Sequence, residues 1–359
     1  MTISIALSGC VGGTTPDAAP AGQADGLATT PSAPQASSER VTRLPSHVTS
    51  DVVPRQGLPA SFPTDLERIP EFEAGPNASA WLAYRPRETL RDGRGWSSET
   101  IALWNGSWTK LSLGGLGIPQ KLWPGGDMLG PGDLDDTGTR LAFDTTSGVI
   151  VVNLTSGLWE PYIEDAGRVG SIRWYPGGSR FVADPWNGRD KVVNVTTGEA
   201  ADSAIPTLGL GFLGEGDVVT VTRRGDVDRV RNTSGSNIAD LPASPRQRGR
   251  YFASWWAGNR VAYSNYETVG GRYALRVADI ATGQPLAVLT WSRRTGAFLQ
   301  VHGWLDERRI LLSMDRGLVT WAPETGNISR LAELPRSDVR QQHAAVSISF
   351  RQPRPNPAP

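Results

Sequence analysis

Short apolar runs alternate with polar turns along most of this chain, and many of the turns close on a glycine. Six turns share a short, mostly polar triplet that ends in Gly106, Gly157, Gly198, Gly235, Gly283 or Gly326. These glycines recur at intervals of 37 to 51 residues. Most of the turns follow a run rich in β-branched residues, such as Ile150–Leu154. Repeats of this length are typical of the four-stranded blades of β-propellers.

A second type of turn opens each repeat. It occurs at Asp135–Arg140, Tyr175–Arg180 and Trp256–Arg260, with weaker copies at 213–217 and 305–309. An apolar strand with an aromatic residue near its end thus leads into a tight hairpin and a second strand. A loop, a third strand, the first type of turn and a fourth strand follow. Six such units predict a six-bladed propeller.

The two ends of the repeat region complement each other. The first repeat begins near Ser79 and lacks a first strand, whereas an unassigned β-rich run, Ala344–Phe350, lies near the C-terminus. We expect this run to complete the first blade, because closure removes the open strand edges of an incomplete ring. Only 33 residues follow Gly326, which leaves no room for a seventh blade.

Several of these motifs resemble a known repeat. Trp174–Arg180 and Asp279–Gly283 are similar to the WD40-like repeat of TolB-type propellers, in which a Trp-Ser-Pro-Asp-Gly turn precedes a strand ending in Ala-Phe and an Asp-x-x-x-Gly turn. The resemblance covers about residues 79–350, with divergent copies near Phe212 and Asp306. It implies the fold alone, since such propellers bind partners, sense or catalyse on one scaffold.

Charge and motif content narrow the function classes. The chain has 36 basic and 36 acidic residues, so no basic excess favours nucleic acid as a ligand. A single cysteine excludes an intramolecular disulfide and any CxxC metal or redox site. The GxSxG, HExxH and GxxxxGK[ST] motifs of common hydrolases, zinc proteases and phosphate loops do not occur. We therefore expect no cofactor.

The cysteine, Cys10, ends a short apolar segment. Leu7-Ser8-Gly9-Cys10 resembles the lipobox of bacterial lipoproteins, in which the cysteine receives a diacylglyceryl group and the chain is cut before it. The apolar stretch is short and no Lys or Arg precedes it, which suggests an upstream start codon. The resemblance implies a lipid anchor at Cys10 on the outer face of the bacterial cytoplasmic membrane, or secretion. The alternative is an unmodified cysteine in a flexible tail.

Residues 11–60 are dense in Ala, Pro, Ser, Thr and Gly and have few large apolar side chains. Such a segment cannot bury enough surface to offset the entropy of ordering, so we expect a disordered tether with an end-to-end distance of roughly 40 Å. The predicted organisation is a lipobox signal at 1–10, this linker at 11–60, the propeller at 61–350 and a disordered tail at 351–359.

Two segments imitate ligand-binding motifs. Gly209–Gly214 satisfies GxGxxG, but the β-branched run Val218–Val221 follows it in place of the helix that a dinucleotide site needs. Asp133–Gly138 gathers three carboxylates, but it aligns with the hairpin turn of the other repeats and lacks the glutamate of a calcium loop. We interpret them as a strand hairpin and a plain turn.

Two of the histidines are candidate catalytic residues. His302 and His343 precede the predicted first strands of blades six and one, where both would lie near the mouth of a central channel. A metal site needs a third ligand, and none is apparent, so no metal is expected. The pair nevertheless supports an alternative function, an envelope hydrolase or lactonase with its site at the channel mouth.

Aromatic and arginine side chains in the inter-strand loops of one face form a candidate binding surface. This set comprises Trp96, Trp186, Tyr266, Trp291, Arg293 and Arg294. Such residues are frequent contact hot spots when they lie in loops. The alternative, in which these loops fold back over blade edges, stays open.

The sequence thus predicts an all-β, six-bladed propeller closed by a C-terminal strand and tethered through a lipid. We expect a monomeric envelope module that binds a protein or another ligand, and we favour this role over the enzyme.

Overall fold

Strands make up most of the regular structure in the part of the chain that the computed structural model describes. That part comprises residues 39–45, 48, 58–63, 65–86, 100–123, 134–145, 147–163, 169–185, 188–203, 210–213, 217–224, 227–232, 234–242, 253–264, 268–269, 272–292, 299–314, 317–334 and 346–350. Contacts divide the chain into two compact units, Met1–Ala36 and Ser37–Pro359, and the described residues all belong to the second. Among them, no helix is long and apolar enough to cross a bilayer.

The described residues of the second unit form two short 3-10 helices and six sheets, and we number the sheets in chain order. The helices are η1 (Leu66–Arg68) and η2 (Gln120–Leu122). Sheet one has the order β25 (Val346–Phe350), β2 (Leu82–Pro86), β3 (Thr100–Trp104), β4 (Trp108–Ser112). Sheet two has the order β5 (Arg140–Asp144), β6 (Val149–Asn153), β7 (Trp159–Tyr162). Sheet three has the order β8 (Val169–Trp174), β9 (Arg180–Pro185), β10 (Lys191–Asn194), β11 (Ala200–Asp202).

The remaining sheets come from the second half of the chain. Sheet four has the order β12 (Leu210–Leu213), β13 (Asp217–Arg224), β14 (Val227–Asn232), β15 (Asn237–Pro242). Sheet five has the order β16 (Ala253–Ala257), β17 (Arg260–Ser264), β19 (Arg272–Asp279), β20 (Pro285–Trp291), β1 (Arg40–Arg43), and β18 (Thr268–Val269) also pairs with β19. Sheet six has the order β21 (Gln300–Asp306), β22 (Arg309–Met314), β23 (Gly317–Trp321), β24 (Ile328–Glu333).

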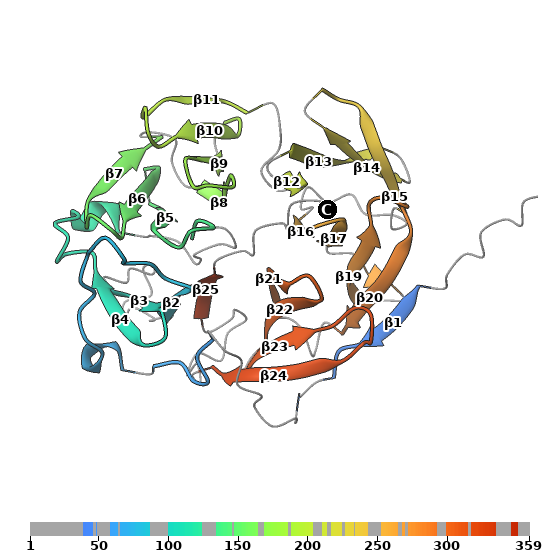
Figure 1. Ribbon diagram of the computed structural model, residues 1–359, viewed down its shortest axis with the longest axis horizontal. Coiled ribbons are helices and arrows are strands. Elements are labelled where there is room, and N and C mark those ends of the chain that lie inside the picture. Colours follow the sequence, from blue (N-terminus) through green and yellow to red (C-terminus); the bar gives the residue numbers. More distant parts are fainter. Residues whose placement is uncertain are drawn as a thin grey trace, which may run out of the picture. The chain divides into compact units, whose positions relative to one another are not determined.

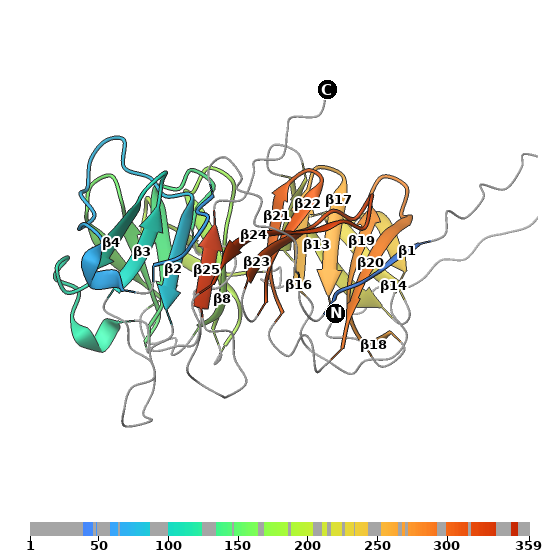
Figure 2. The ribbon, with the colours of Figure 1, turned by 90° about the horizontal axis from the view of Figure 1, so that it is seen from below.

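The sheets have the all-β arrangement of a propeller. Figure 1 shows them placed around a common centre, and the view at right angles in Figure 2 shows their strands crossing the thickness of the ring. Five sheets have at least four strands. Sheet two has three, and an isolated bridge joins Leu134 to Leu141 of β5. Five sheets therefore form full blades, and sheet two lacks a regular first strand among the described residues.

The C-terminal strand closes sheet one as predicted. β25 pairs antiparallel with β2, from Leu82 opposite Phe350 to Pro86 opposite Val346. It supplies the first strand that the first repeat lacks, so the two ends of the repeat region meet in one ladder. The predicted closing strand is confirmed over residues 346–350.

The six glycine turns are also confirmed, since five join the third strand of a blade to the fourth and the Gly157 turn joins β6 to β7, the last two strands of sheet two. Their glycines have φ angles between 67° and 81°, a left-handed conformation that glycine adopts without steric cost. A side-chain oxygen near the start of the turn often caps it. For example, the Oδ1 of Asn153 and that of Asn194 accept bonds from the amides of Thr155 and Thr196, at 3.0 and 2.9 Å.

Five clusters of buried apolar side chains join neighbouring sheets. They link sheets one and two, two and three, four and five, five and six, and six and one. The largest fully buried side chains include Trp304 and Trp321 in sheet six and Phe143 in sheet two. Burying such side chains contributes roughly 1.5–3 kcal/mol each, so these interfaces dominate the stability of the ring.

The boundary between sheets three and four is different. No apolar cluster of described residues joins them. Ala183 of β9 packs toward sheet two, so its neighbour Asp184 points to the opposite side of the strand, toward sheet four. Val230 of β14 packs toward sheet five, so Arg229 points back toward sheet three by the same alternation. Val182, which is fully buried, faces the same side as Asp184, so the described side chains at this boundary are both apolar and charged.

Part of the predicted linker is ordered. We expected residues 11–60 to be disordered, but β1 lies within that range and Leu44 is buried. The composition averaged over 50 residues hid a six-residue run, Glu39–Leu44, with few small residues. A strand so short needs no core of its own, because the edge of an existing sheet supplies all of its hydrogen-bonding partners.

Candidate binding groove at the edge of sheet five

β20 is a long apolar strand at the outer side of sheet five. Its residues Ala287–Thr290 are all buried, with at most 3% of their surface exposed. An uncovered strand of this kind presents a row of free N–H and C=O groups and pairs readily with another chain. In this protein β1 covers that row, and Figure 2 shows β1 lying along β20.

Main-chain bonds hold β1 in a parallel register. Arg40 lies opposite Ala287, and the pairing continues to Arg43 opposite Thr290. Beyond the last pair, the amide of Leu44 donates to the Thr290 carbonyl oxygen at 2.8 Å. Main-chain pairing of this kind supplies affinity without reading the identity of the side chains.

An ion pair fixes the start of the segment. Arg276 of β19 donates through Nη1 to Oε1 of Glu39 at 2.7 Å. The two side chains are only 15% and 23% exposed, so water and salt screen this pair less than an ordinary surface pair. Loss of either partner leaves the other charge partly buried and unpaired, which is costly.

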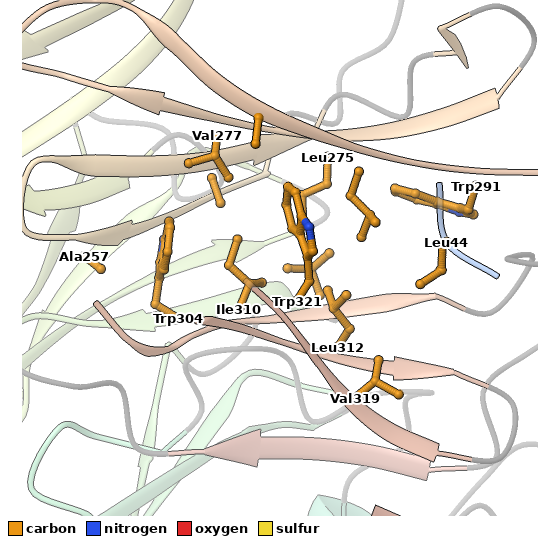
Figure 3. Close-up of a cluster of buried hydrophobic side chains, with 14 residues drawn as sticks. Leu44, Ala257, Leu275, Val277, Trp291, Trp304, Ile310, Leu312, Val319 and Trp321 are labelled. Carbon is orange, nitrogen blue, oxygen red and sulfur yellow. The ribbon is translucent and has the colours of Figure 1, made fainter. Parts of the chain in front are cut away.

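A pocket fixes the other end of the segment. Leu44 is 4% exposed and belongs to the cluster between sheets five and six, where Figure 3 shows it beside Trp291. Full burial of a leucine is worth roughly 1.5–3 kcal/mol relative to an exposed one. Leu44 is therefore the strongest apolar anchor of the segment.

A turn of sheet six forms the second wall. The Thr325 carbonyl oxygen, between β23 and β24, accepts a bond from Nη1 of Arg40 at 3.2 Å. A Cβ added to Gly326 would lie 3.0 Å from Oγ1 of Thr42, so the turn approaches β1 closely. We call the surface formed by β20, Arg276, the Leu44 pocket and the Thr325–Gly326 turn the β1 groove.

Three residues of β1 are exposed to solvent. They are Arg40, Val41 and Arg43, and Val41 exposes 62% of its surface. Two arginines on an edge strand disfavour the addition of a further strand. Recognition in the groove thus depends on the main chain and mainly on the three less exposed positions, Glu39, Thr42 and Leu44.

The same N-terminal segment continues along two more sheet edges. Ser61 forms a parallel bridge with Glu333 of β24, and Glu71 forms one with Lys110 of β4. Nε1 of Trp108 donates to the Ser61 carbonyl oxygen at 3.1 Å. Phe62 packs into the cluster between sheets six and one. The segment therefore lies against the outer strands of sheets five, six and one in turn.

Of the predicted loop set, the structure describes Trp291 only, and its predicted position was wrong. Trp291 is the last residue of β20, 6% exposed, and stacks on Tyr273 with ring centroids 5.8 Å apart. The ladder between β19 and β20 extends to Trp291, which draws this residue into the sheet. It lines the Leu44 pocket, so it contributes to a binding site of a different kind from the predicted surface.

The other predicted site residues lie outside the described part of the chain. They are Cys10, Trp96, Trp186, Tyr266, Arg293, Arg294 and His343. His302 is described and fully buried within β21, not ahead of it. His302 is therefore not exposed at a channel mouth, where the prediction placed it together with His343. Among described side chains, no group of three or more His, Cys, Asp or Glu residues is placed to hold a metal ion.

The acidic turn 133–138 is structural, as predicted, over its described residues. Asp135 is 1% exposed, and its Oδ1 accepts bonds from the amides of Thr139 and Arg140 at 2.8 and 3.1 Å. Oδ1 of Asp136 accepts a bond from the amide of Gly177 in the next sheet at 3.0 Å. These carboxylates hold a turn and join two sheets. The GxGxxG segment likewise enters a strand, β12, which pairs with β13.

Two carboxyl groups lie close together in sheet three. Asp184 follows Ala183, which pairs with Lys191, so Asp184 and Asp190 lie at facing ends of β9 and β10. Burial, and to a smaller degree the charge of Asp190 and a hydrogen bond to it, raise the pKa of Asp184 to about 6. Lys191, assisted by Arg189, lowers the pKa of nearby Asp202. The described residues give the two carboxyl groups no third ligand for a metal ion.

Sequence reasoning missed the β1 groove because its parts are far apart in the chain. Glu39 and Arg276, or Arg40 and Thr325, meet only through the fold. One local signal was present, since Glu39–Leu44 interrupts a stretch of small and polar residues with larger side chains.

Comparisons with known proteins extend this picture little. No family model and no curated protein sequence matches the chain. Among solved structures, a chain in the crystal structure of the mitotic checkpoint complex has a TM-score of 0.44 and 14% identity, covering 82% of this chain and 92% of that one. TolB from Acinetobacter baumannii has a TM-score of 0.44 and 13% identity, covering 75% of this chain and 66% of that one. These similarities carry no functional argument, and the propeller arrangement rests on the sheet topology.

Proposed function

We propose that this protein is a binding module of the bacterial cell envelope. A propeller, tethered through a lipid on Cys10 to the outer face of the cytoplasmic membrane, binds a protein or another ligand. The observation that carries the proposal is the β1 groove, which holds an extended segment by main-chain pairing, one ion pair and one apolar pocket. Strand addition at a sheet edge is a common mode of peptide recognition.

The lipidation proposal rests on sequence. Cys10 precedes β1, and Glu39, the first described residue of the chain, pairs with Arg276 of sheet five. The lipobox resemblance of Leu7–Cys10 is the support for lipidation, and a secreted form is the alternative location.

We also propose that sheet two is the sixth blade. Its three strands follow the same layout as the second to fourth strands of the other sheets. The bridge from Leu134 to Leu141 stands where a first strand would pair with β5.

The loop residues Trp96, Trp186, Tyr266, Arg293 and Arg294 form a second proposed contact surface for the same function. The enzyme alternative has less support, because the buried position of His302 does not suit a site at a channel mouth. No observation on the described residues favours it.

The binding function is tested by capture from detergent-solubilised membranes with the full chain carrying a C-terminal tag. We expect one partner to be retained in saturable amounts, and its retention to fall at least several-fold with Arg276→Glu or with the pair Arg293→Ala and Arg294→Ala. Arg68→Ala, at an exposed residue far along the chain from both surfaces, is the matched control. Equal recovery of every protein by all variants and by an unrelated bait would refute the binding module.

A further inference from the structure

We infer that the β1 groove is an exchangeable acceptor site for an extended segment of a partner protein, and that β1 occupies it as an internal competitor. The segment that fits runs parallel to β20 and carries a carboxylate, a small β-branched or hydroxyl residue three positions later, and a leucine two positions after that. This inference rests on the proposed binding function and names the kind of partner.

The contacts of β1 define what the groove accepts. Arg276 reads the carboxylate, because it pairs with Glu39 in a site that is largely shielded from water. The close approach of Gly326 to Thr42 restricts that position to a small side chain. The pocket beside Trp291 accepts an unbranched or γ-branched apolar side chain, as it accepts Leu44. The exposed side chains of Val41 and Arg43 place no restriction on sequence.

The described part of β1 does not pair along the whole of β20. β20 has seven residues, and the described ladder with β1 covers four of them, Ala287–Thr290, with one further bond from the Leu44 amide to Thr290. A strand that continues the ladder past either end, at Leu286 or Trp291, can therefore pair with more of this edge than the described part of β1 does. The buried residues of β20 pack mainly against Leu275 and Val277 of their own sheet and against sheet six, so these contacts persist when β1 leaves.

The occupant that gains most is a partner protein, not a second copy of this chain. The β1 of the same chain is present at an effective concentration in the millimolar range because it is covalently linked. The β1 of a second copy has the same contacts without that advantage, so it cannot displace the first. A partner with a longer matching strand gains additional main-chain bonds and can compete.

The test uses the full chain and a fluorescent peptide with the sequence of residues 37–48. In the parent chain β1 competes with the peptide. Leu44→Asp in the protein places a charge where the pocket is apolar and empties the groove. We expect the peptide to bind this variant at least tenfold more tightly than the parent, as measured by fluorescence anisotropy. Glu39→Lys, which keeps Leu44, serves if the first variant unfolds, and it should give a smaller gain.

Specificity is tested by a charge exchange. A protein that carries both Leu44→Asp and Arg276→Glu should lose the peptide, and a peptide with Glu39→Arg should restore binding. A scrambled peptide is the control. If the emptied protein binds the parent and scrambled peptides equally, the acceptor site is refuted.

Two further outcomes separate the proposals. If light scattering shows that the parent chain is a dimer that the peptide dissociates, a second copy is the occupant and the partner assignment is wrong. If the peptide does not bind but capture of a membrane partner persists, the groove inference fails while the binding function stands.

Discussion

At the scale of single residues, sequence reasoning succeeded where a local conformation decides the role. The glycine turns were predictable because a left-handed residue between two strands favours glycine whatever surrounds it. Trp291 was misplaced because its role depends on how far the β19–β20 ladder extends, and Asp184 was not singled out because its environment comes from sheet packing. Substitutions at Gly138 and at Asp184 should change the stability of the protein measurably.

Gly138→Ala should destabilise the fold by about 3 kcal/mol or more, because φ is +72° and the new Cβ would lie 2.2 Å from the Ala80 carbonyl oxygen. Gly106→Ala is the matched control. Gly106 has φ of +81° with open space around it, so only the backbone strain of about 1–2 kcal/mol applies. Urea denaturation of both variants measures the difference, and equal losses would show that the contact with Ala80 has no role.

Asp184→Asn should change how stability depends on pH. The folded-state pKa of Asp184 is raised from 3.8 to about 6, so the folded protein holds this proton more tightly than the unfolded chain does. Stability from this group is therefore present below pH 4 and is lost as pH rises toward 6. The variant avoids that loss and should gain up to about 1 kcal/mol relative to the parent at pH 7, allowing for solvent screening of a half-buried group.

Asp202→Asn is the control, because the fold shifts the pKa of Asp202 in the opposite direction to that of Asp184. Lys191 lowers the pKa of Asp202, so that carboxylate stabilises the fold at neutral pH and its removal should not increase stability. Melting temperatures of the parent and both variants at pH 4 and pH 7 give the comparison. A pH-independent difference between the parent and Asp184→Asn would mean that Asp184 does not titrate as described.

At the scale of elements, the sequence predicted strands whose pattern repeats and missed the one that does not. β25 was predictable because the first repeat lacked a strand that the tail supplied. β1 was not, because four residues have no periodicity to recognise and its pairing partner lies nearly 250 residues away. The pairing of an edge strand depends on which edge the finished fold leaves open.

Deletion of residues 344–359 should cost several kcal/mol, because the antiparallel ladder with β2 and its packing are lost and an inner edge of sheet one opens. The truncated protein should melt at a lower temperature and aggregate. Deletion of 351–359 alone removes no described strand, so it should leave the melting temperature nearly unchanged. If both truncations melt like the parent, β25 does not close the ring.

At the scale of the whole molecule, the all-β class, the propeller arrangement and the closing strand followed from one repeat length. The repeat length did not predict which side chains lie at each boundary between neighbouring sheets. Among the described residues, apolar clusters join five pairs of neighbouring sheets, whereas the sides of sheets three and four that face each other carry Asp184 and Arg229 beside the apolar Val182. A repeat specifies the strands, but the residues that face a given neighbour vary independently of it.

The proposed anchor gives a prediction for the whole chain. When the gene is expressed with its upstream signal, the protein should sediment with membranes, and Cys10→Ser should move most of it to the soluble or secreted fraction. The propeller should remain folded in both, because no described contact involves Cys10. Fractionation with immunodetection measures the distribution, and equal membrane association of the two forms rules out lipidation.

Hydrogen–deuterium exchange of the full chain tests most directly whether an extended segment occupies the groove of sheet five. In the parent protein, the amides of β1 that face β20, which are every second amide up to that of Leu44, should exchange much more slowly than those of an unstructured peptide, since they bond to β20. Leu44→Asp should remove this protection and deprotect β20 over Ala287–Thr290, while β17 keeps its protection. Exchange of residues 40–44 in the parent at the rate of a free peptide would contradict the account.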